Sequence, residues 1–272
     1  MIEEADHFLE ECDVLATALS AAKPETFAAV TQFKTWTIED VIAHLFMWNV
    51  AADLTLTAPE KFRDFIAFAL GRLGAGQTHP QLQRAWLDEN FGDLSGVDLF
   101  AAWREQYPQL AQQYRSAEPE ARVAWAGPDM SARAKIIARQ METWAHGQEV
   151  FDALGADRAE GDRIQNIAHL GVTTYSWAFR NRGLTPPSPK PHVLLSAPSG
   201  ATWTWNEPQA ENAIIGDAVE FCQVVAQTRN MRDTKLVTKG DTAAQWMSIA
   251  QCFAGPPEDP PRAGARHKSR RG

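Results

Sequence analysis

The sequence lacks any apolar run long enough to cross a membrane, since no stretch of about 18 or more apolar residues occurs in it. Its first residues, Met-Ile-Glu-Glu-Ala-Asp, are acidic, whereas a secretory signal peptide starts with basic and then apolar residues. Cysteine is scarce: Cys12, Cys222 and Cys252 are odd in number and far apart, which argues against a disulfide framework. We therefore expect a cytoplasmic protein without a membrane segment.

Positive charge is also scarce outside the C-terminal tail. The formal net charge is −8, and the segment from Gly255 onwards holds five Arg or Lys and two Asp or Glu, so the rest of the chain carries −11. Contacts to phosphates need clustered Lys and Arg, so we expect no nucleic-acid partner. Residues 257–272 lack large apolar side chains, which predicts a disordered basic tail.

What the sequence does contain is enough apolar material for one large domain or two modest ones. It has 272 residues, of which 44% are hydrophobic. Ten tryptophans are many for this length, and they indicate either a roomy aromatic-lined pocket or simply an aromatic core.

The most informative stretch runs from Arg139 to Gly155 and is predicted to be a helix. It carries Glu142 and His146 four residues apart, a spacing that places two side chains one above the other on a helix, with Cβ atoms roughly 5–6 Å apart. A carboxylate and an imidazole at that separation can close on one cation. A catalytic metal site usually takes three protein ligands and keeps one position open, so a third ligand must come from elsewhere.

His44 is the candidate for that third ligand. Thr37 and Asp40 form a capping-box pattern ahead of an apolar run, and the helix they predict places His44 on the same stripe as Val41 and Trp48. An imidazole on an apolar stripe must be satisfied by some partner. Hydrogen bonding within the core satisfies it as well as a metal does, so the spacing alone leaves both interpretations open.

The polar residues around Glu142 also allow a second interpretation. Arg139, Glu142, His146 and Glu149 form one line along the predicted helix, between two apolar sides. Such a line is either a solvated polar stripe or an inward-facing site.

The remainder of the first part is helical by periodicity. Helices are predicted over 3–22, 97–116 and 131–155, together with the one that begins after Thr37, and Pro108 is expected to kink or split the helix over 97–116. Residues 59–92 form a helical insertion with two helices, 59–73 and 80–90. Four long helices of this kind favour an up-and-down four-helix bundle, in which metal sites are built from inward side chains of facing helices.

After Gly155 the pattern changes to that of a small α/β unit. The predicted elements are a helix over 163–182, a hairpin over 193–196 and 202–205, a helix over 217–229, a strand over 235–238 and a helix over 241–253. The predicted fold class is therefore α+β. The domains are expected at 1–158 (bundle), 159–256 (α/β domain) and 257–272 (tail).

The motifs together resemble a known family. Trp36-Thr…Asp40-Val-Ile-Ala-His44-Leu, followed about a hundred residues later by Glu142-x-x-x-His146, is similar to the mycothiol-dependent maleylpyruvate isomerase family, within the DinB-like metal-binding bundles. Ile215-Gly-Asp-Ala…Arg229 and Trp246…Phe253-Ala-Gly-Pro-Pro resemble the sterol-carrier-like domain of those proteins. The resemblance covers about residues 1–256. It is closest to an uncharacterised metal-binding subgroup marked by Met-Glu-Thr-Trp-Ala-His-Gly-Gln and Ala-His-Leu-Gly.

The resemblance implies a metal site and a catalytic residue. It assigns His44, Glu142 and His146 as ligands of a divalent metal, for which we expect zinc. It also assigns Arg229 as a catalytic residue that faces the metal from the second domain. The other interpretation of Arg229 is a cation that stabilises the end of a helix through the macrodipole.

By the same resemblance, the function is that of an enzyme using a metal-activated low-molecular-weight thiol, such as mycothiol. The reaction would be cis–trans isomerisation or S-transfer on a small carboxylate. The alternatives are a metal-dependent hydrolase with activated water and a non-enzymatic metal- and ligand-binding protein. The insertion at 59–92 departs from the characterised isomerases and is expected to change the pocket. We expect a monomer or homodimer whose partners are a small-molecule substrate and the thiol.

Overall fold

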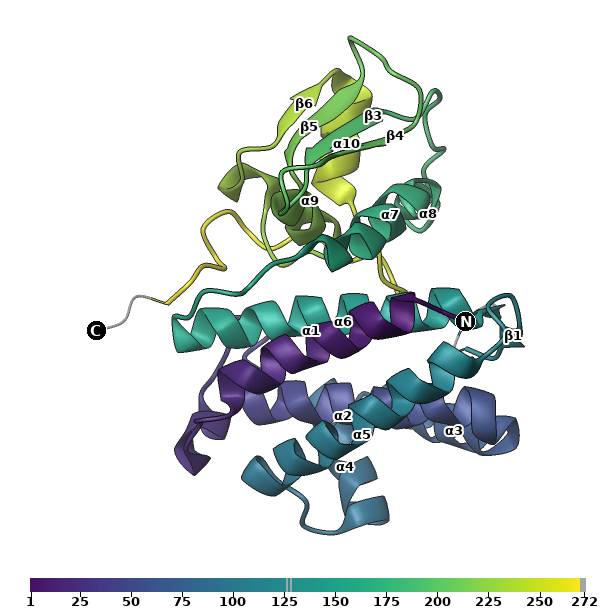
Figure 1. The fold of residues 1–272 in the computed structure, drawn as a ribbon, viewed down its shortest axis with the longest axis vertical. Coiled ribbons are helices and arrows are strands. Elements are labelled where there is room, and N and C mark those ends of the chain that lie inside the picture. The colour runs from purple at the N-terminus through teal and green to yellow at the C-terminus, as the bar shows by residue number, and fades with distance from the viewer. Residues whose placement is uncertain (126, 128, 270–272) are drawn as a thin grey trace. The chain divides into compact units, whose positions relative to one another are not determined.

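The computed structural model describes residues 1–125, 127 and 129–269 (Figure 1). The chain divides into two compact units, the first ending at Ala156 and the second beginning at Asp157. Among the described residues, no helix combines the length and the apolar character that crossing a membrane requires.

The first unit is built around four long helices, of which each packs against at least two others. Helix α1 packs against α5 and α6, and α2 packs against the same two helices. Figure 1 shows all four lying side by side. Their bounds are α1 (Glu4–Leu19), α2 (Ile38–Thr57), α5 (Gly96–Ser116) and α6 (Ala132–Leu154). The predicted four-helix bundle is confirmed.

The insertion folds as two helices that pack on α2. Helix α3 spans Pro59–Gly74 and α4 spans His79–Phe91, close to the predicted bounds. Three short elements were not predicted: a 3-10 helix, η1 (Pro24–Ala28), and a two-stranded ribbon of β1 (Arg122–Val123) and β2 (Met130–Ser131). The insertion therefore adds a helical layer beside the helix that carries His44.

Local caps determine where the two site-bearing helices begin and end. In α2, the Thr37 hydroxyl accepts a hydrogen bond from the Asp40 amide at 3.1 Å, and the Thr37 amide donates to the Asp40 carboxylate at 2.8 Å. This is the predicted capping box. In α6, the Ser131 hydroxyl accepts from the Ala134 amide at 3.2 Å. Gly155 ends the helix at a φ of 60°, in the left-handed region that glycine adopts without strain.

Pro108 does not split α5, contrary to one of the two outcomes expected for it. The helix runs without interruption through this residue. Proline removes the bond to the carbonyl of Arg104, but both residues are on the exposed side of the helix. Water can therefore satisfy that carbonyl, and the lost bond costs less than it would in the core.

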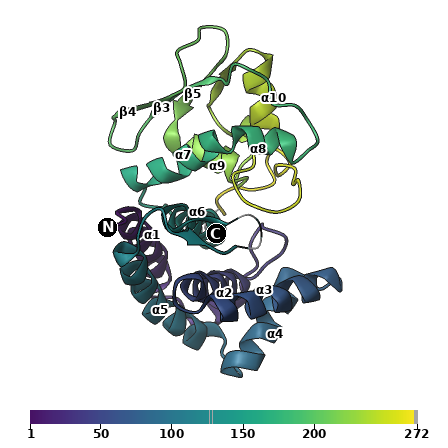
Figure 2. The same ribbon diagram turned by 90° about the vertical axis from the view of Figure 1, so that its right-hand side faces the viewer.

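The second unit has a mixed four-stranded sheet in the order β4-β3-β5-β6. Strand β3 pairs antiparallel with β4 and parallel with β5, and β5 pairs antiparallel with β6. Figure 2 shows this sheet with its helices from a second side. The elements are η2 (Asp162–Ile164), α7 (Gln165–Thr173), α8 (Tyr175–Arg180), β3 (His192–Ser196), β4 (Thr202–Trp205), β5 (Ala213–Asp217), α9 (Ala218–Val225), η3 (Met231–Asp233), β6 (Val237–Lys239) and α10 (Asp241–Ile249). A small α/β unit after the helical part was predicted.

Three helices of this unit differ from their predicted form. The one expected over 241–253 ends at Ile249. The helix expected over 163–182 is broken at Thr174, whose hydroxyl bonds the carbonyls of Leu170 at 2.7 Å and Gly171 at 3.0 Å and so competes with the helical ladder. The helix expected to reach Arg229 ends at Val225. Gln227 adopts a φ of 56°, and the Thr228 amide bonds the Gln223 carbonyl at 2.9 Å, which forms a Schellman-type stop.

Strand β5 and the tail also differ from expectation. Strand β5 was not predicted, because it is short and its apolar run consists only of Ala213, Ile214 and Ile215. The tail was expected to be disordered, but its described part bonds to the second unit. Arg266 donates to the Gln227 carbonyl at 2.7 Å, and Asp233 accepts from the Gly264 amide at 2.9 Å. Hydrogen bonds to the second unit thus hold a segment that has no apolar core of its own. Residues 270–272 lie outside the described part.

Candidate metal centre

Helices α2 and α6 bring three candidate ligands together. The Nε2 atom of His44 lies 3.3 Å from Oε2 of Glu142, and Nε2 of His146 lies 3.4 Å from the same oxygen. The three ligand atoms all lie within 4.8 Å of one another. The structure therefore brings together residues that are 98 positions apart in the sequence.

These distances suit a small divalent cation. Ligand atoms about 2.0–2.1 Å from a tetrahedral zinc lie roughly 3.3 Å from each other by geometry. Two imidazoles and one carboxylate are a common donor set for catalytic zinc, and three protein ligands leave one position open. The residues therefore fit the implied metal, while metal binding itself stays a prediction.

The protonation states of the cluster suit the same use. Burial, together with the nearby His146, lowers the pKa of His44 to about 3, so the ring is neutral at physiological pH. Burial raises the pKa of the Glu142 carboxyl, but the hydrogen bonds from His146 and His44 outweigh it and hold that pKa well below its usual range. An ionised carboxylate and a neutral imidazole are the forms that bind metal.

Aromatic rings enclose the two histidines. Trp36 stacks on His146 with ring centroids 5.5 Å apart and an interplanar angle of 3°, and Phe33 meets the same imidazole edge-on at 5.1 Å. Trp36 also lies 5.4 Å from the His44 ring, and Trp48 lies 6.2 Å from it. Sequence reasoning placed Trp36 in the family motif but gave it no role. Its ring contacts the imidazoles of both candidate ligands and so restricts their orientation.

Gln83 on α4 is a further partner that sequence reasoning missed. Its side-chain nitrogen lies 3.0 Å from Nδ1 of His44, on the opposite side of that ring from Glu142. The sequence feature that could have pointed to it is a polar residue on the same helix face as the apolar Trp86 and Leu87. The insertion thus contributes directly to the surroundings of one candidate ligand.

The polar line on α6 faces inward rather than towards solvent. The Arg139 side chain is buried, with 2% exposure, and donates from Nε to the Asn49 carbonyl oxygen at 3.0 Å and from Nη2 to the Leu45 carbonyl at 3.3 Å. A buried guanidinium needs such partners and a nearby opposite charge, which Glu142 supplies one turn further along the helix. The interpretation as a solvated stripe is therefore wrong for Arg139, Glu142 and His146.

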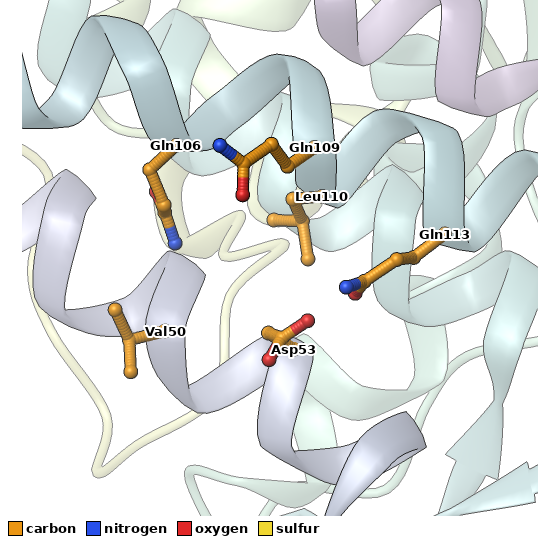
Figure 3. A pocket seen from close by; sticks show the side chains of 6 residues that line it. All are labelled: Val50, Asp53, Gln106, Gln109, Leu110 and Gln113. Carbon is orange, nitrogen blue, oxygen red and sulfur yellow. The ribbon is translucent and has the colours of Figure 1, made fainter.

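A small hollow elsewhere in the first unit does not belong to this cluster. It measures about 140 Å³ and is lined by two residues of α2 and four of α5 (Figure 3). Those residues are Val50, Asp53, Gln106, Gln109, Leu110 and Gln113. None of the three candidate ligands lines it.

The chain's own thiols and Arg229 are divided between the two units. Cys12 is buried on α1, with its sulfur 4.0 Å from the Thr143 hydroxyl, and burial raises the pKa of its thiol well above the usual value. Cys222 and Cys252 are buried in the second unit. Arg229 is half-buried there, in the loop after α9, and donates from Nη1 to the Thr228 carbonyl at 2.8 Å.

Comparison with known proteins agrees with this geometry. Residues 8–151 match the model of the mycothiol maleylpyruvate isomerase N-terminal domain. Uncharacterized proteins from two strains of Mycobacterium tuberculosis are 35% identical over 250 residues, covering 91% of this chain and 93% of theirs.

The fold is also that of solved structures. Crystal structures of the mycothiol-dependent maleylpyruvate isomerase and of a mutant of it superpose with TM-scores of 0.50 and 0.52 at 16% identity. Each match covers 83% of this chain and 88% of the other. The family model spans the helices that carry His44, Glu142 and His146, and the chain therefore belongs to the mycothiol maleylpyruvate isomerase family.

Proposed function

We propose that this chain is a metal-dependent enzyme that uses a low-molecular-weight thiol, such as mycothiol, for cis–trans isomerisation or S-transfer on a small carboxylate substrate. The observation that carries the proposal is the convergence of His44, Glu142 and His146 within 4.8 Å, inside the segment that defines the family. In this proposal the bundle, residues 1–158, holds the metal. The sterol-carrier-like α/β domain, residues 159–256, supplies Arg229.

The bundle residues prepare the site for a cation, for which we propose zinc. Glu142 brings a negative charge and His44 a neutral donor, and the rings of Trp36 and Phe33 hold the imidazole of His146. A divalent cation held by these residues would lower the pKa of a thiol bound to it, so that the thiolate would be present at neutral pH. Because Cys12 is buried and protonated, we propose that this thiol comes from outside the chain.

The proposed reaction needs the thiolate to add reversibly to an activated cis double bond. The new carbon–sulfur bond leaves a single bond between the former alkene carbons, rotation about it follows, and elimination re-forms the double bond as trans and releases the thiolate. The sulfur is neither oxidised nor reduced. We assign to Arg229 the task of holding a substrate carboxylate through two parallel N–H···O bonds.

The experiment that tests the function joins three measurements on the purified protein. Native mass spectrometry detects a bound thiol, elemental analysis counts metal per chain, and chromatography follows conversion of maleylpyruvate with and without added mycothiol. We expect one divalent metal per chain and conversion only in the presence of the thiol. Hydrolysis of esters or amides without any thiol would support the hydrolase alternative. Ligand binding that survives removal of the metal would support a non-enzymatic protein.

A second prediction concerns Arg229. We expect Arg229→Ala to lower turnover by at least about tenfold and Arg229→Lys to fail as well, because an ammonium cannot reproduce the planar, two-pronged contact of a guanidinium. Metal content should stay at the wild-type level in both variants. Turnover and elemental analysis on the same preparations check this.

The matched control is Arg232→Ala, a change at an exposed arginine of η3 in the same unit. Full activity in Arg229→Ala would remove Arg229 from the reaction and leave the bundle alone to carry it. Arg229 would then be a cation at the end of α9 that costs under about 0.5 kcal/mol of stability when removed.

A further inference from the structure

Gln83 occupies an unusual position beside the candidate metal centre. It lies on α4, its side chain has 0% exposure, and its Nε2 atom is 3.0 Å from Nδ1 of His44. Its carbonyl oxygen, Oε1, is buried and has no hydrogen-bond partner among the described residues. A buried amide oxygen without a partner costs on the order of 1–3 kcal/mol, so this arrangement needs an explanation.

The contact determines which His44 nitrogen carries the hydrogen. An amide nitrogen only donates, so Nδ1 of His44 must accept and the ring hydrogen must be on Nε2. That hydrogen then points at Oε2 of Glu142, 3.3 Å away. Both contacts agree with one tautomer of the neutral ring.

This tautomer cannot bind a metal through Nε2, because that nitrogen then has no free lone pair. A ligand at Nε2 requires the hydrogen on Nδ1. In the present orientation, that hydrogen would face the donor nitrogen of Gln83, and two donors would oppose each other. A half-turn of the amide removes the conflict by bringing Oε1 to Nδ1, where it accepts the ring hydrogen.

We propose that Gln83 sets the tautomer of His44 and that its amide turns over when metal binds, which makes it a positioning residue of the metal site. This inference rests on the proposed function, since it deepens the description of the same site. The half-turn exchanges one hydrogen bond for another of opposite polarity, and no partner on Oε1 holds the amide in its present orientation. His44 keeps one ring hydrogen throughout, so its charge does not change.

The inference also gives the insertion a role. Gln83 belongs to α4, the second helix of the 59–92 insertion. Helix α4 packs on α2, the helix that carries His44. Outer partners that orient ligating histidines typically change metal affinity 10- to 100-fold when they are removed. The two candidate ligands on α6 have no described hydrogen bond to Gln83, so the effect should pass through His44.

The test compares Gln83→Met, which removes both polar atoms, with Gln83→Glu, which leaves only oxygens facing Nδ1. Zinc affinity is measured by competition with a chelator. We expect Gln83→Met to weaken zinc binding about 10- to 100-fold and Gln83→Glu to stay within a few-fold of wild type. Gln109→Met, an exposed glutamine on α5, is the matched control and should change nothing.

The second measurement is nitrogen NMR of the histidine rings, with the His44 signals identified by their loss in His44→Ala. We expect hydrogen on Nε2 in the metal-free wild type and on Nδ1 both after zinc is added and in metal-free Gln83→Glu. Wild-type affinity in Gln83→Met, or the same tautomer with and without zinc, would overturn the role of Gln83. A wild-type protein that binds no zinc at all would instead overturn the proposed function, and the metal-coupled half-turn with it.

Discussion

Replacing Glu142 by Gln is expected to abolish stoichiometric metal binding and to lower turnover by more than about 100-fold, the upper end of what outer partners of ligands cost. The change keeps the shape of the side chain but removes the negative charge on which Nε2 of His44 and Nε2 of His146 converge at 3.3 and 3.4 Å. His44→Ala and His146→Ala should lose the metal as well. Elemental analysis and the thiol-dependent assay on the same preparations measure both effects.

The control for this series is Glu105→Gln, at an exposed carboxylate on α5. It should retain wild-type metal content and turnover. The melting temperature of Glu142→Gln should lie below that of the metal-free wild type, because the buried guanidinium of Arg139 loses the opposite charge that Glu142 supplies. Full metal content in all three ligand variants would contradict the site.

Replacing Lys135 by Met is expected to stabilise the protein at pH 7 by about 3–5 kcal/mol. Lys135 on α6 has 0% exposure, and its Nζ lies 2.9 Å from the centroid of the Trp125 ring and 5.5 Å from that of Phe62. No hydrogen-bond partner for this nitrogen is found in the described part of the chain. Burial lowers its pKa to about 6, and the nearby Arg139 adds to the effect. Methionine keeps the length and the contact with the rings without the cost of losing a proton.

The same substitution should change how stability depends on pH. The pKa of Lys135 is lower in the folded protein than its ordinary value of 10.5, so the unfolded chain holds the proton more tightly. The penalty is complete below about pH 6 and disappears as pH rises towards 10.5, with a slope of about 1.4 kcal/mol per pH unit. The wild type should therefore gain stability relative to Lys135→Met over this window.

Chemical denaturation at several pH values measures the difference between the two proteins. Because every other titrating group is shared, the difference isolates Lys135. The exposed Lys61→Met on α3 serves as control and should follow the wild type at each pH. Parallel stability curves for the wild type and Lys135→Met would show that Lys135 keeps its charge when the chain folds.

Local patterns were sufficient for the elements that carry the site. The helix ends depend on neighbours within a few residues, so local sequence patterns predict them directly. They are the capping box of Thr37 and Asp40, the Ser131 cap and the Gly155 stop. The pairing of Glu142 with His146 is also local, because one turn of a helix brings them together. The four-helix bundle followed from the lengths and periodicity of such segments. The family motif then pointed to His44 as a partner, which helical spacing alone left open.

Tertiary structure alone decided what surrounds these residues. Strand β5 owes its form to pairing with β3 and β6, and its own short apolar run was too weak to predict it. The contact of Gln83 with His44 joins two helices, and the burial of Lys135 depends on Trp125 and Phe62 from other segments. Periodicity reports which face of a helix is apolar, but it does not report which side chain from another segment faces it. The sequence by itself therefore determined the helices and the local pair of Glu142 and His146. Packing over long sequence distances decided the contact of Gln83 with His44, the burial of Lys135 and the approach of His44 to Glu142.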